Sequence, residues 1–218
     1  MRRLLALALL AACAPAPEPD TRSFALYRAM QTCLADPATA GCTRVDRARG
    51  FVVLADDDPA KPRAWLLVPD VEVTGIEDSR ALVPPVVAFW RHGWTVGRDL
   101  LPGERLALAI NSKGGRTQDL LHIHISCLAP EIAGTLAATP VGPGWTTTLT
   151  LDGHAYHARR TATLEPSPFL LLRDLPGARE DMAAQSLAVT AAPGGGFLLL
   201  AESAPDAEAE EILDETCP

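Results

Sequence analysis

Two histidines separated by one residue, His122 and His124, have the spacing that places both side chains on one face of a β-strand. Ser126 continues that face, whereas Leu121 and Ile123 belong to the opposite, apolar face. Near neutral pH an imidazole can serve as a nucleophile, a base, an acid or a metal ligand. The pair is therefore the first candidate for chemistry in this chain.

A polar loop precedes the histidines at residues 111–117, and its composition suits a phosphate group. Backbone N–H groups around Gly114 and Gly115, a guanidinium and short polar side chains can all donate hydrogen bonds to phosphoryl oxygens. A histidine beside such a loop favours nucleophilic attack on phosphorus, which splits one difficult displacement into two easier ones. The predicted substrate-binding residues are Asn111, Ser112, Gly115, Arg116 and Thr117.

Two other interpretations of the histidine pair remain open. A His-x-His pair on a strand also suits zinc or copper, but no third ligand occurs at a convincing spacing, so the sequence predicts no metal and no cofactor. Alternatively, the two histidines are exposed residues of a strand and have no catalytic or binding role. For a bare His-x-His this is the commoner case; the adjacent loop weighs against it here but does not remove it.

The elements that must position these residues follow from the hydrophobic pattern. Strands joined by short turns predict a single α+β domain over residues 23–218, with a mainly antiparallel sheet and few packed helices. The predicted helices are 23–34, 86–100 and 178–186, with a solvated helix in the acidic tail 202–215. The predicted strands are 50–55, 64–69, 106–110, the histidine segment, 145–151, 154–163, 187–191 and 197–200.

The first 22 residues indicate export. A basic start leads into the apolar stretch 4–12, which is far shorter than the roughly 20 residues of a membrane-spanning helix. It ends in Leu-Ala-Ala-Cys, which resembles the lipobox of bacterial lipoproteins. We therefore expect a signal segment at 1–13, lipidation at Cys13, a Pro-rich tether at 14–22 and a membrane anchor on the periplasmic side. An ordinary secretory signal is the alternative, and it also predicts export.

Export changes the interpretation of the remaining four cysteines, which form an even set in an oxidising compartment. Three pairings are possible. Cys33 and Cys42 are close in sequence across a turn, which leaves Cys127 to pair with Cys217. The second bridge would close a long loop and contribute about 4–5 kcal/mol in the chain-entropy model. Alternatively, one or both pairs stay reduced; a zinc site is disfavoured because no Cys-x-x-Cys spacing occurs.

The charge of the chain argues against nucleic acid as a partner. Loss of Arg2 and Arg3 with the signal segment leaves 17 of the 19 basic residues against 27 acidic ones, a formal charge of −10. Such a balance disfavours adhesion to nucleic acid or to an anionic membrane through charge alone. Much of the acidity lies in the tail 202–215, to which we assign no function.

At the histidines the sequence resembles the histidine-triad motif, in which a glutamine lies four positions before the first of the alternating histidines. Gln118 has that position, and Ser126 stands where many members have a third histidine. This departure and the pattern of residues 111–118 are similar to one branch, the bacterial CDP-diacylglycerol diphosphatases. The resemblance extends roughly from Cys33 to Cys217, with shorter matches at 50–54, 75–78, 153–160 and 167–169.

The resemblance implies a histidine-triad-like α+β fold and hydrolysis of the membrane lipid CDP-diacylglycerol to CMP and phosphatidate, without a metal. His124 would attack the cytidine-side phosphorus and become cytidylylated before water releases CMP. His122 would orient and polarise the site, and Gln118 would contact the phosphate. Ser126 leaves the leaving-group acid unassigned. Phosphatidate is itself a stabilised anion, so a strong acid is not required.

Two further functions stay open at this point. One is a histidine-triad-like hydrolase that acts on another nucleotide diphosphate, either soluble or linked to a lipid. The other is a non-catalytic, lipid-anchored protein that binds a ligand or a metal. His154, Arg159 and Arg160 either contact the pyrophosphate or the cytidine, or belong to an exposed basic strand.

Overall fold

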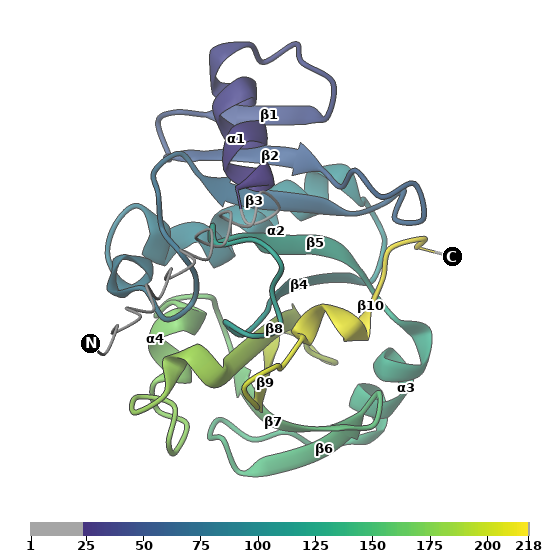
Figure 1. Cartoon of the computed structure of the whole chain (residues 1–218). Helices are drawn as coiled ribbons and strands as arrows, with labels where there is room; N and C mark the ends of the chain where they lie inside the picture. Colours follow the sequence, from purple (N-terminus) through teal and green to yellow (C-terminus); the bar gives the residue numbers. More distant parts are fainter. Residues whose placement is uncertain (1–23, 218) are drawn as a thin grey trace, which may run out of the picture.

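A ten-stranded sheet forms the centre of the computed structural model, which describes residues 24–217 (Figure 1). Its order is β1-β2-β3-β5-β4-β8-β9-β7-β6, with the short β10 paired to β5, and every neighbouring pair is antiparallel. The predicted α+β class with a mainly antiparallel sheet is confirmed. The strands are β1 Cys42–Asp46, β2 Phe51–Ala55, β3 Trp65–Pro69, β4 Leu106–Ile110, β5 Ile123–Leu128, β6 Thr147–Leu151, β7 His154–Thr161, β8 Gln185–Ala191, β9 Phe197–Ser203 and β10 Leu213–Asp214.

One face of the sheet is covered by α2, which buries Phe89 and Trp90 in the largest apolar cluster. The helix lies close to the strands because Gly97 faces them: a Cβ there would lie only 2.6 Å from Cδ1 of Leu106. The helices are α1 Ala25–Ala35, α2 Phe89–Leu100, α3 Pro130–Ala138 and α4 Pro168–Leu172, with short 3-10 turns η1 Ser79–Leu82, η2 Val86–Ala88, η3 Met182–Ala184 and η4 Ala209–Ile212.

The other face of the sheet is covered in two places. Helix α1 packs Leu26 and Met30 against apolar residues of β2 and β3. Helix α3 and the C-terminal segment, defined as residues 204–217, cover the strands farther along the sheet, where Ala209 and Ile212 are fully buried. Figure 1 shows α1 in purple and the C-terminal segment in yellow on this same face. Between α1 and the C-terminal segment, strand β5, which carries His124, faces a pocket.

Two predicted hairpins are confirmed. Strands β2 and β3 pair in antiparallel register across the polar turn that follows Ala55. Strands β6 and β7 pair around Asp152 and Gly153, whose φ angles are 45° and 86°. Two consecutive residues at positive φ fit the type I′ turns that tight hairpins favour, which explains the Asp-Gly sequence.

Two predicted helices are wrong. Residues 178–186 contain only η3, and β8 already begins at Gln185, because its backbone pairs with Ser203 of β9. Tertiary pairing therefore overrides the local helical preference. The acidic tail is also not a solvated helix: Glu202 lies inside β9, and the remainder packs onto the sheet through η4 and β10. Strand β1 and helices α3 and α4 were not expected.

Both predicted disulfides are confirmed, Cys33–Cys42 and Cys127–Cys217, each with a Cα–Cα distance of 5.3 Å. The second bridge ties the C-terminal segment to β5, beside the pairing of β10 with that strand. The predicted signal segment, Cys13 and the tether lie outside the described residues. Among residues 24–217, no helix combines the length and apolar character that crossing a membrane requires.

Candidate active site

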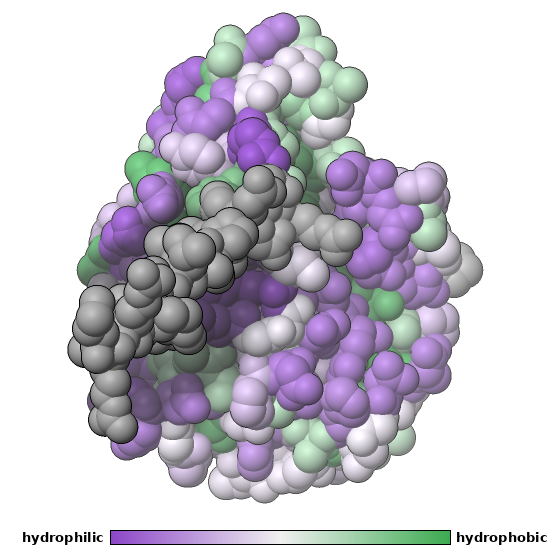
Figure 2. All heavy atoms as spheres, viewed as in Figure 1, coloured by the Kyte–Doolittle hydropathy of each residue, from purple (hydrophilic) through white to green (hydrophobic). Residues whose placement is uncertain are grey.

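A pocket of about 540 Å³ opens between α1 and the C-terminal segment, with β3 and β5 forming its floor. Pockets of this size accommodate small-molecule ligands. Figure 2 shows hydrophilic residues gathered on this face of the molecule over the β2–β3 turn and over the C-terminal segment. The polar lining residues are Thr32, Thr39, Asp56, Asp57, Asp58, Lys61, Asn111, Arg116, Thr117, Gln118, His122, His124, Glu208 and Glu210.

The histidine pair faces this pocket. His122 and His124 lie on the pocket face of the chain, with ring centroids 4.9 Å apart and an edge-to-face arrangement. Ile123 and Ile125, on the opposite face, are fully buried in the main apolar cluster. The alternation predicted from the sequence is confirmed, although the strand begins one residue after His122.

His122 is held as a neutral imidazole. Its Nδ1 lies 2.7 Å from the carbonyl oxygen of Leu120, so Nδ1 carries the proton that is donated and Nε2 keeps its lone pair. Burial, assisted by the nearby charge of His124, lowers the pKa of His122 to about 4. His122 is therefore neutral at physiological pH.

We expect the stability of the protein to fall as the pH drops from 6.5 to 4 because of His122. The unfolded histidine takes up a proton near its ordinary pKa of 6.5, whereas the folded one resists protonation until about 4. The unfolded state therefore binds more protons within this window, at a cost of roughly 3 kcal/mol by its lower end. Urea unfolding across the window should show a weaker pH dependence in His122→Gln, and an unchanged slope would contradict the assignment. His157→Gln is the matched control.

His124 has a carboxylate partner that the sequence did not reveal. Its Nε2 lies 2.8 Å from Oε2 of Glu210 in η4, although without the alignment of a hydrogen bond. Burial alone would raise the pKa of Glu210, but the charges of His124 and Lys61 outweigh it and lower that pKa to about 2. An ionised carboxylate thus stands directly beside the imidazole nitrogen.

Lys61 is the second pocket residue that sequence reasoning missed. Its Nζ lies 3.9 Å from Oε1 of Glu210 and 3.4 Å from Oε1 of Glu215. Of the pocket-lining residues in the described part of the chain, Lys61 and Arg116 carry the basic side chains. No local motif marks Lys61, because it lies in a turn that reaches the site only through the pairing of β2 with β3.

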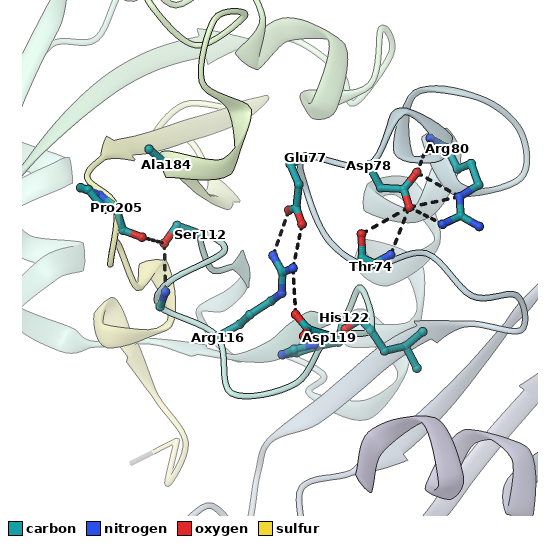
Figure 3. Close-up of polar contacts among 12 residues, drawn as sticks. Thr74, Glu77, Asp78, Arg80, Ser112, Arg116, Asp119, His122, Ala184 and Pro205 are labelled. Carbon is teal, nitrogen blue, oxygen red and sulfur yellow. Dashed lines mark hydrogen bonds and ion pairs between the residues drawn. The ribbon is translucent and has the colours of Figure 1, made fainter. Parts of the chain in front are cut away.

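Arg116 lines the pocket, but its guanidinium is engaged elsewhere. It forms two hydrogen bonds with the carboxylate of Glu77, at 2.9 and 2.7 Å, and one at 3.1 Å with Asp119 (Figure 3). Only 4% of its side chain is exposed. The expected phosphate contact through Arg116 is replaced by an ion pair that fastens the loop 111–117 to the segment around Glu77.

Removal of Glu77 should destabilise the protein strongly. We expect Glu77→Ala to lower the free energy of unfolding by about 3 kcal/mol, because the buried guanidinium of Arg116 loses its two-point partner. The matched change Asp119→Ala affects a carboxylate that is 59% exposed and should cost less than about 1 kcal/mol. Urea unfolding measures both, and equal losses would contradict the structural role of the Glu77 pair.

The backbone donors of the loop are also occupied. The N–H groups of Ser112 and Gly114 donate to the carbonyl oxygens of Ala207 and Pro205, and the N–H of Gly115 donates to Oγ of Ser112. Figure 3 shows Ser112 turned toward Pro205, to whose carbonyl its hydroxyl donates. These N–H groups, which the sequence analysis offered for phosphate, therefore have partners within the protein. Those of Ser112 and Gly114 hold the C-terminal segment against the loop.

The remaining predicted residues divide between the pocket and its support. Gln118 and Thr117 line the pocket, and the side-chain oxygen of Gln118 accepts from the N–H of Leu26 at the start of α1. Asn111 also lines the pocket, where its side-chain oxygen accepts from the N–H of Glu210. That bond helps to place the carboxylate beside His124.

Ser126 does not reach the pocket. It shares the histidine face but is fully buried, and its hydroxyl donates to the carbonyl oxygens of Arg63 and Asp214 at 2.9 and 3.2 Å. Ser126 stands where the histidine-triad motif often has a third histidine. In this chain its side chain binds the end of the C-terminal segment. A catalytic role for Ser126 therefore has no geometric support.

His154, Arg159 and Arg160, the other candidate substrate contacts from the sequence, do not line the pocket. Arg159 pairs with Asp174, and Arg160 donates to two backbone carbonyls near the β8–β9 turn. His154 contacts a separate group of carboxylates. None of the three is among the residues that line the pocket in the described chain.

The sequence is similar to known proteins over most of its length. Residues 22–218 match the family model described as CDP-diacylglycerol pyrophosphatase. A CDP-diacylglycerol pyrophosphatase from Yersinia pestis is 39% identical over 200 residues, which cover 81% of this chain and 75% of that protein.

Among solved structures, yeast Ap4A phosphorylase Apa2 in complex with Ap4A matches with a TM-score of 0.50 and 14% identity, over 82% of this chain and 65% of that one. Its complex with AMP gives a TM-score of 0.48 and 15% identity, over 80% and 63%. The chain thus spans just under two thirds of these phosphorylases. The match to the Ap4A complex confirms the expected histidine-triad-like fold and no more.

Proposed function

The chain belongs to the CDP-diacylglycerol pyrophosphatase family, and from that premise we propose that it hydrolyses the diphosphate bond of CDP-diacylglycerol to CMP and phosphatidate. The observation that carries this proposal is the pair of buried imidazoles on the floor of a pocket of about 540 Å³, with Lys61 and Gln118 beside them. Such a pocket supplies a nitrogen nucleophile together with donors for phosphoryl oxygens.

His124 is the proposed nucleophile. In its neutral form it attacks the cytidine-side phosphorus through the lone pair of Nε2, forming a P–N bond while the P–O bond to phosphatidate breaks and its electrons stay on the phosphatidate oxygen. Phosphatidate leaves as a stabilised anion, which removes the need for the acid that Ser126 cannot provide. Water then adds its oxygen to the phosphorus and loses a proton to solvent, while the P–N bond breaks, its electron pair returns to Nε2, and CMP departs from the neutral imidazole.

The neighbours of His124 have distinct roles in this proposal. Neutral His122 packs edge-to-face on the nucleophile and fixes its ring. Gln118 uses its oxygen to bind α1, so its amide nitrogen is the part that donates to phosphate. Lys61 supplies the accessible positive charge, because its side chain is 28% exposed even beside Glu210 and Glu215, whereas that of Arg116 is only 4% exposed.

Glu210 must give way to the substrate. Its carboxylate stands 2.8 Å from Nε2 of His124, where the diphosphate has to approach. Two like charges a few ångströms apart repel by about 1 kcal/mol or more even in water. We therefore expect Glu210→Gln to lower the KM for CDP-diacylglycerol about five-fold or more. Glu208→Gln, which lacks a contact with either histidine, should change KM less, and an increased KM in Glu210→Gln would contradict this role.

The direct test of function is CMP release from CDP-diacylglycerol in detergent micelles, with a chelator present. CMP and phosphatidate are expected in equal amounts. Failure to release CMP would overturn the proposal. Release of mononucleotide from soluble dinucleoside polyphosphates, with no activity on the lipid, would instead identify a hydrolase of another nucleotide diphosphate.

We further propose that the protein acts on the periplasmic face of a membrane, anchored through a lipid on Cys13. The support is the sequence of the first 22 residues, together with two disulfides in the folded domain, which suit an oxidising compartment. Replacement of Cys13 by alanine should release the protein from the membrane fraction. Unchanged membrane association in that variant would contradict the anchor.

A further inference from the structure

A second polar cluster lies on the same face of the sheet as His124, on the other side of η4. It consists of His154 at the start of β7, Glu202 near the end of β9 and Glu211 in η4. The Nδ1 atom of His154 lies 3.0 Å from Oε1 of Glu202 and 3.2 Å from Oε1 of Glu211. Consecutive residues of η4 thus reach two separate sites, because Glu210 faces His124.

The spacing of these atoms matches the edges of a metal coordination shell. Ligand atoms bound to zinc at about 2.0–2.2 Å in a tetrahedral arrangement lie roughly 3.3 Å apart. The two contacts of the His154 nitrogen have nearly that length. One ligand atom from each of the three residues lies within 4.8 Å of the others, so modest side-chain rotation closes the third edge.

Two buried oxygens at this cluster lack partners. Glu202 is only 7% exposed, and its Oε2 has no hydrogen-bond partner among the described residues. Ser186 lies directly opposite Glu202 on β8, is fully buried, and has a hydroxyl that is likewise without a partner there. Directly opposed residues of an antiparallel pair share one face of the sheet. Buried polar groups without partners are rare in folded proteins, and a bound ion can satisfy them.

The charge of the cluster is also unbalanced. Burial, together with the negative charges of Glu202 and Asp152, raises the pKa of Glu211, although the hydroxyl of Tyr156 donates to its Oε1 at 2.8 Å. Two carboxylates therefore share a single histidine, and Asp152 adds a further negative charge that acts on Glu211. A divalent cation would neutralise the repulsion between the carboxylates more fully than the single imidazole of His154 can.

We propose that His154, Glu202 and Glu211 bind a divalent first-row transition-metal ion such as Zn²⁺. Imidazole nitrogen combined with carboxylate oxygen suits such ions, whereas Mg²⁺ and Ca²⁺ favour all-oxygen sites. The half-exposed ring of His154 gives the ion a path from solvent. The site is separate from the pocket, and its ion fastens η4 to the sheet and thereby fixes Glu210 beside His124.

The test is calorimetric titration of the chelator-treated, purified protein with Zn²⁺. We expect saturable binding of one ion and a raised unfolding temperature, because a ligand that binds the folded state stabilises it. Mg²⁺ at equal concentration should leave the unfolding temperature unchanged. Absence of saturable Zn²⁺ binding in the wild type would overturn the proposal.

Two variants locate the ion. Glu202→Gln should weaken Zn²⁺ binding at least ten-fold, while the matched Glu208→Gln should not. Metal-free Glu202→Gln should unfold at or above the wild-type temperature, since it removes a buried charge; if it is misfolded, the partly exposed Glu211→Gln replaces it. Binding that survives both changes but is lost in His124→Ala would place the ion at the pocket and overturn the assignment.

Discussion

Replacement of His124 by alanine is expected to lower the rate of CMP release from CDP-diacylglycerol by a factor of roughly a thousand or more. The loss should appear in kcat, because the variant removes the atom to which the cytidylyl group becomes attached. Binding through Lys61 and Gln118 would persist, so KM should change little. Steady-state kinetics with the lipid in detergent micelles measure both quantities.

The same experiment can detect the intermediate directly. Acid-quenched wild-type enzyme should carry one additional cytidylyl group by intact-protein mass spectrometry, and His124→Ala should carry none. His157→Ala, on β7 and away from the pocket, should retain wild-type activity. Full activity in His124→Ala, or a cytidylyl group located on another residue, would refute the assignment of the nucleophile.

The variant His122→Ala is a more discriminating control for His124→Ala than a variant of a histidine outside the pocket. Nε2 of His122 keeps its lone pair at neutral pH, whereas Nε2 of His124 faces the ionised carboxylate of Glu210. Before substrate binds, His122 is thus the less obstructed imidazole, and only displacement of Glu210 makes His124 reactive. We expect His122→Ala to lower kcat less than His124→Ala and still to form the cytidylyl adduct. An adduct that disappears only in His122→Ala would reverse the two roles.

The sequence predicted what depends on local periodicity. Alternation along β5 placed His122 and His124 on one face, and the even cysteine count led to both disulfides. These signals are strong because a strand has a fixed two-residue repeat and because few pairings were available. The fold class followed from short turns between strands, such as Asp152-Gly153.

The partners of these residues could not be predicted, because they come from distant segments. Glu210 lies 86 positions after His124 in an acidic run that has the composition of a solvated helix. Packing of Ala209 and Ile212 on the sheet, together with the bond from the N–H of Glu210 to Asn111, turns Glu210 toward the imidazole. The ion pair of Arg116 could not be predicted for the same reason, since Glu77, which binds it, belongs to a loop with no motif.

The disulfide between Cys127 and Cys217 should therefore matter for both stability and the site. It closes a loop of 90 residues, and its removal in the Cys127→Ala/Cys217→Ala double variant should lower the free energy of unfolding by about 4–5 kcal/mol in the chain-entropy model. The bridge Cys33–Cys42 closes only 9 residues, so its double variant should lose about 2–3 kcal/mol. Urea unfolding under non-reducing conditions compares the two.

The functional consequence separates the two bridges further. Loss of Cys127–Cys217 frees the end of the segment that carries Glu210 and β10, so the KM for CDP-diacylglycerol should fall in the direction expected for Glu210→Gln. Loss of Cys33–Cys42 leaves that segment in place and should not reproduce this fall. If both double variants lost equal stability and had equal KM values, the C-terminal bridge would have no special role in holding Glu210 against His124.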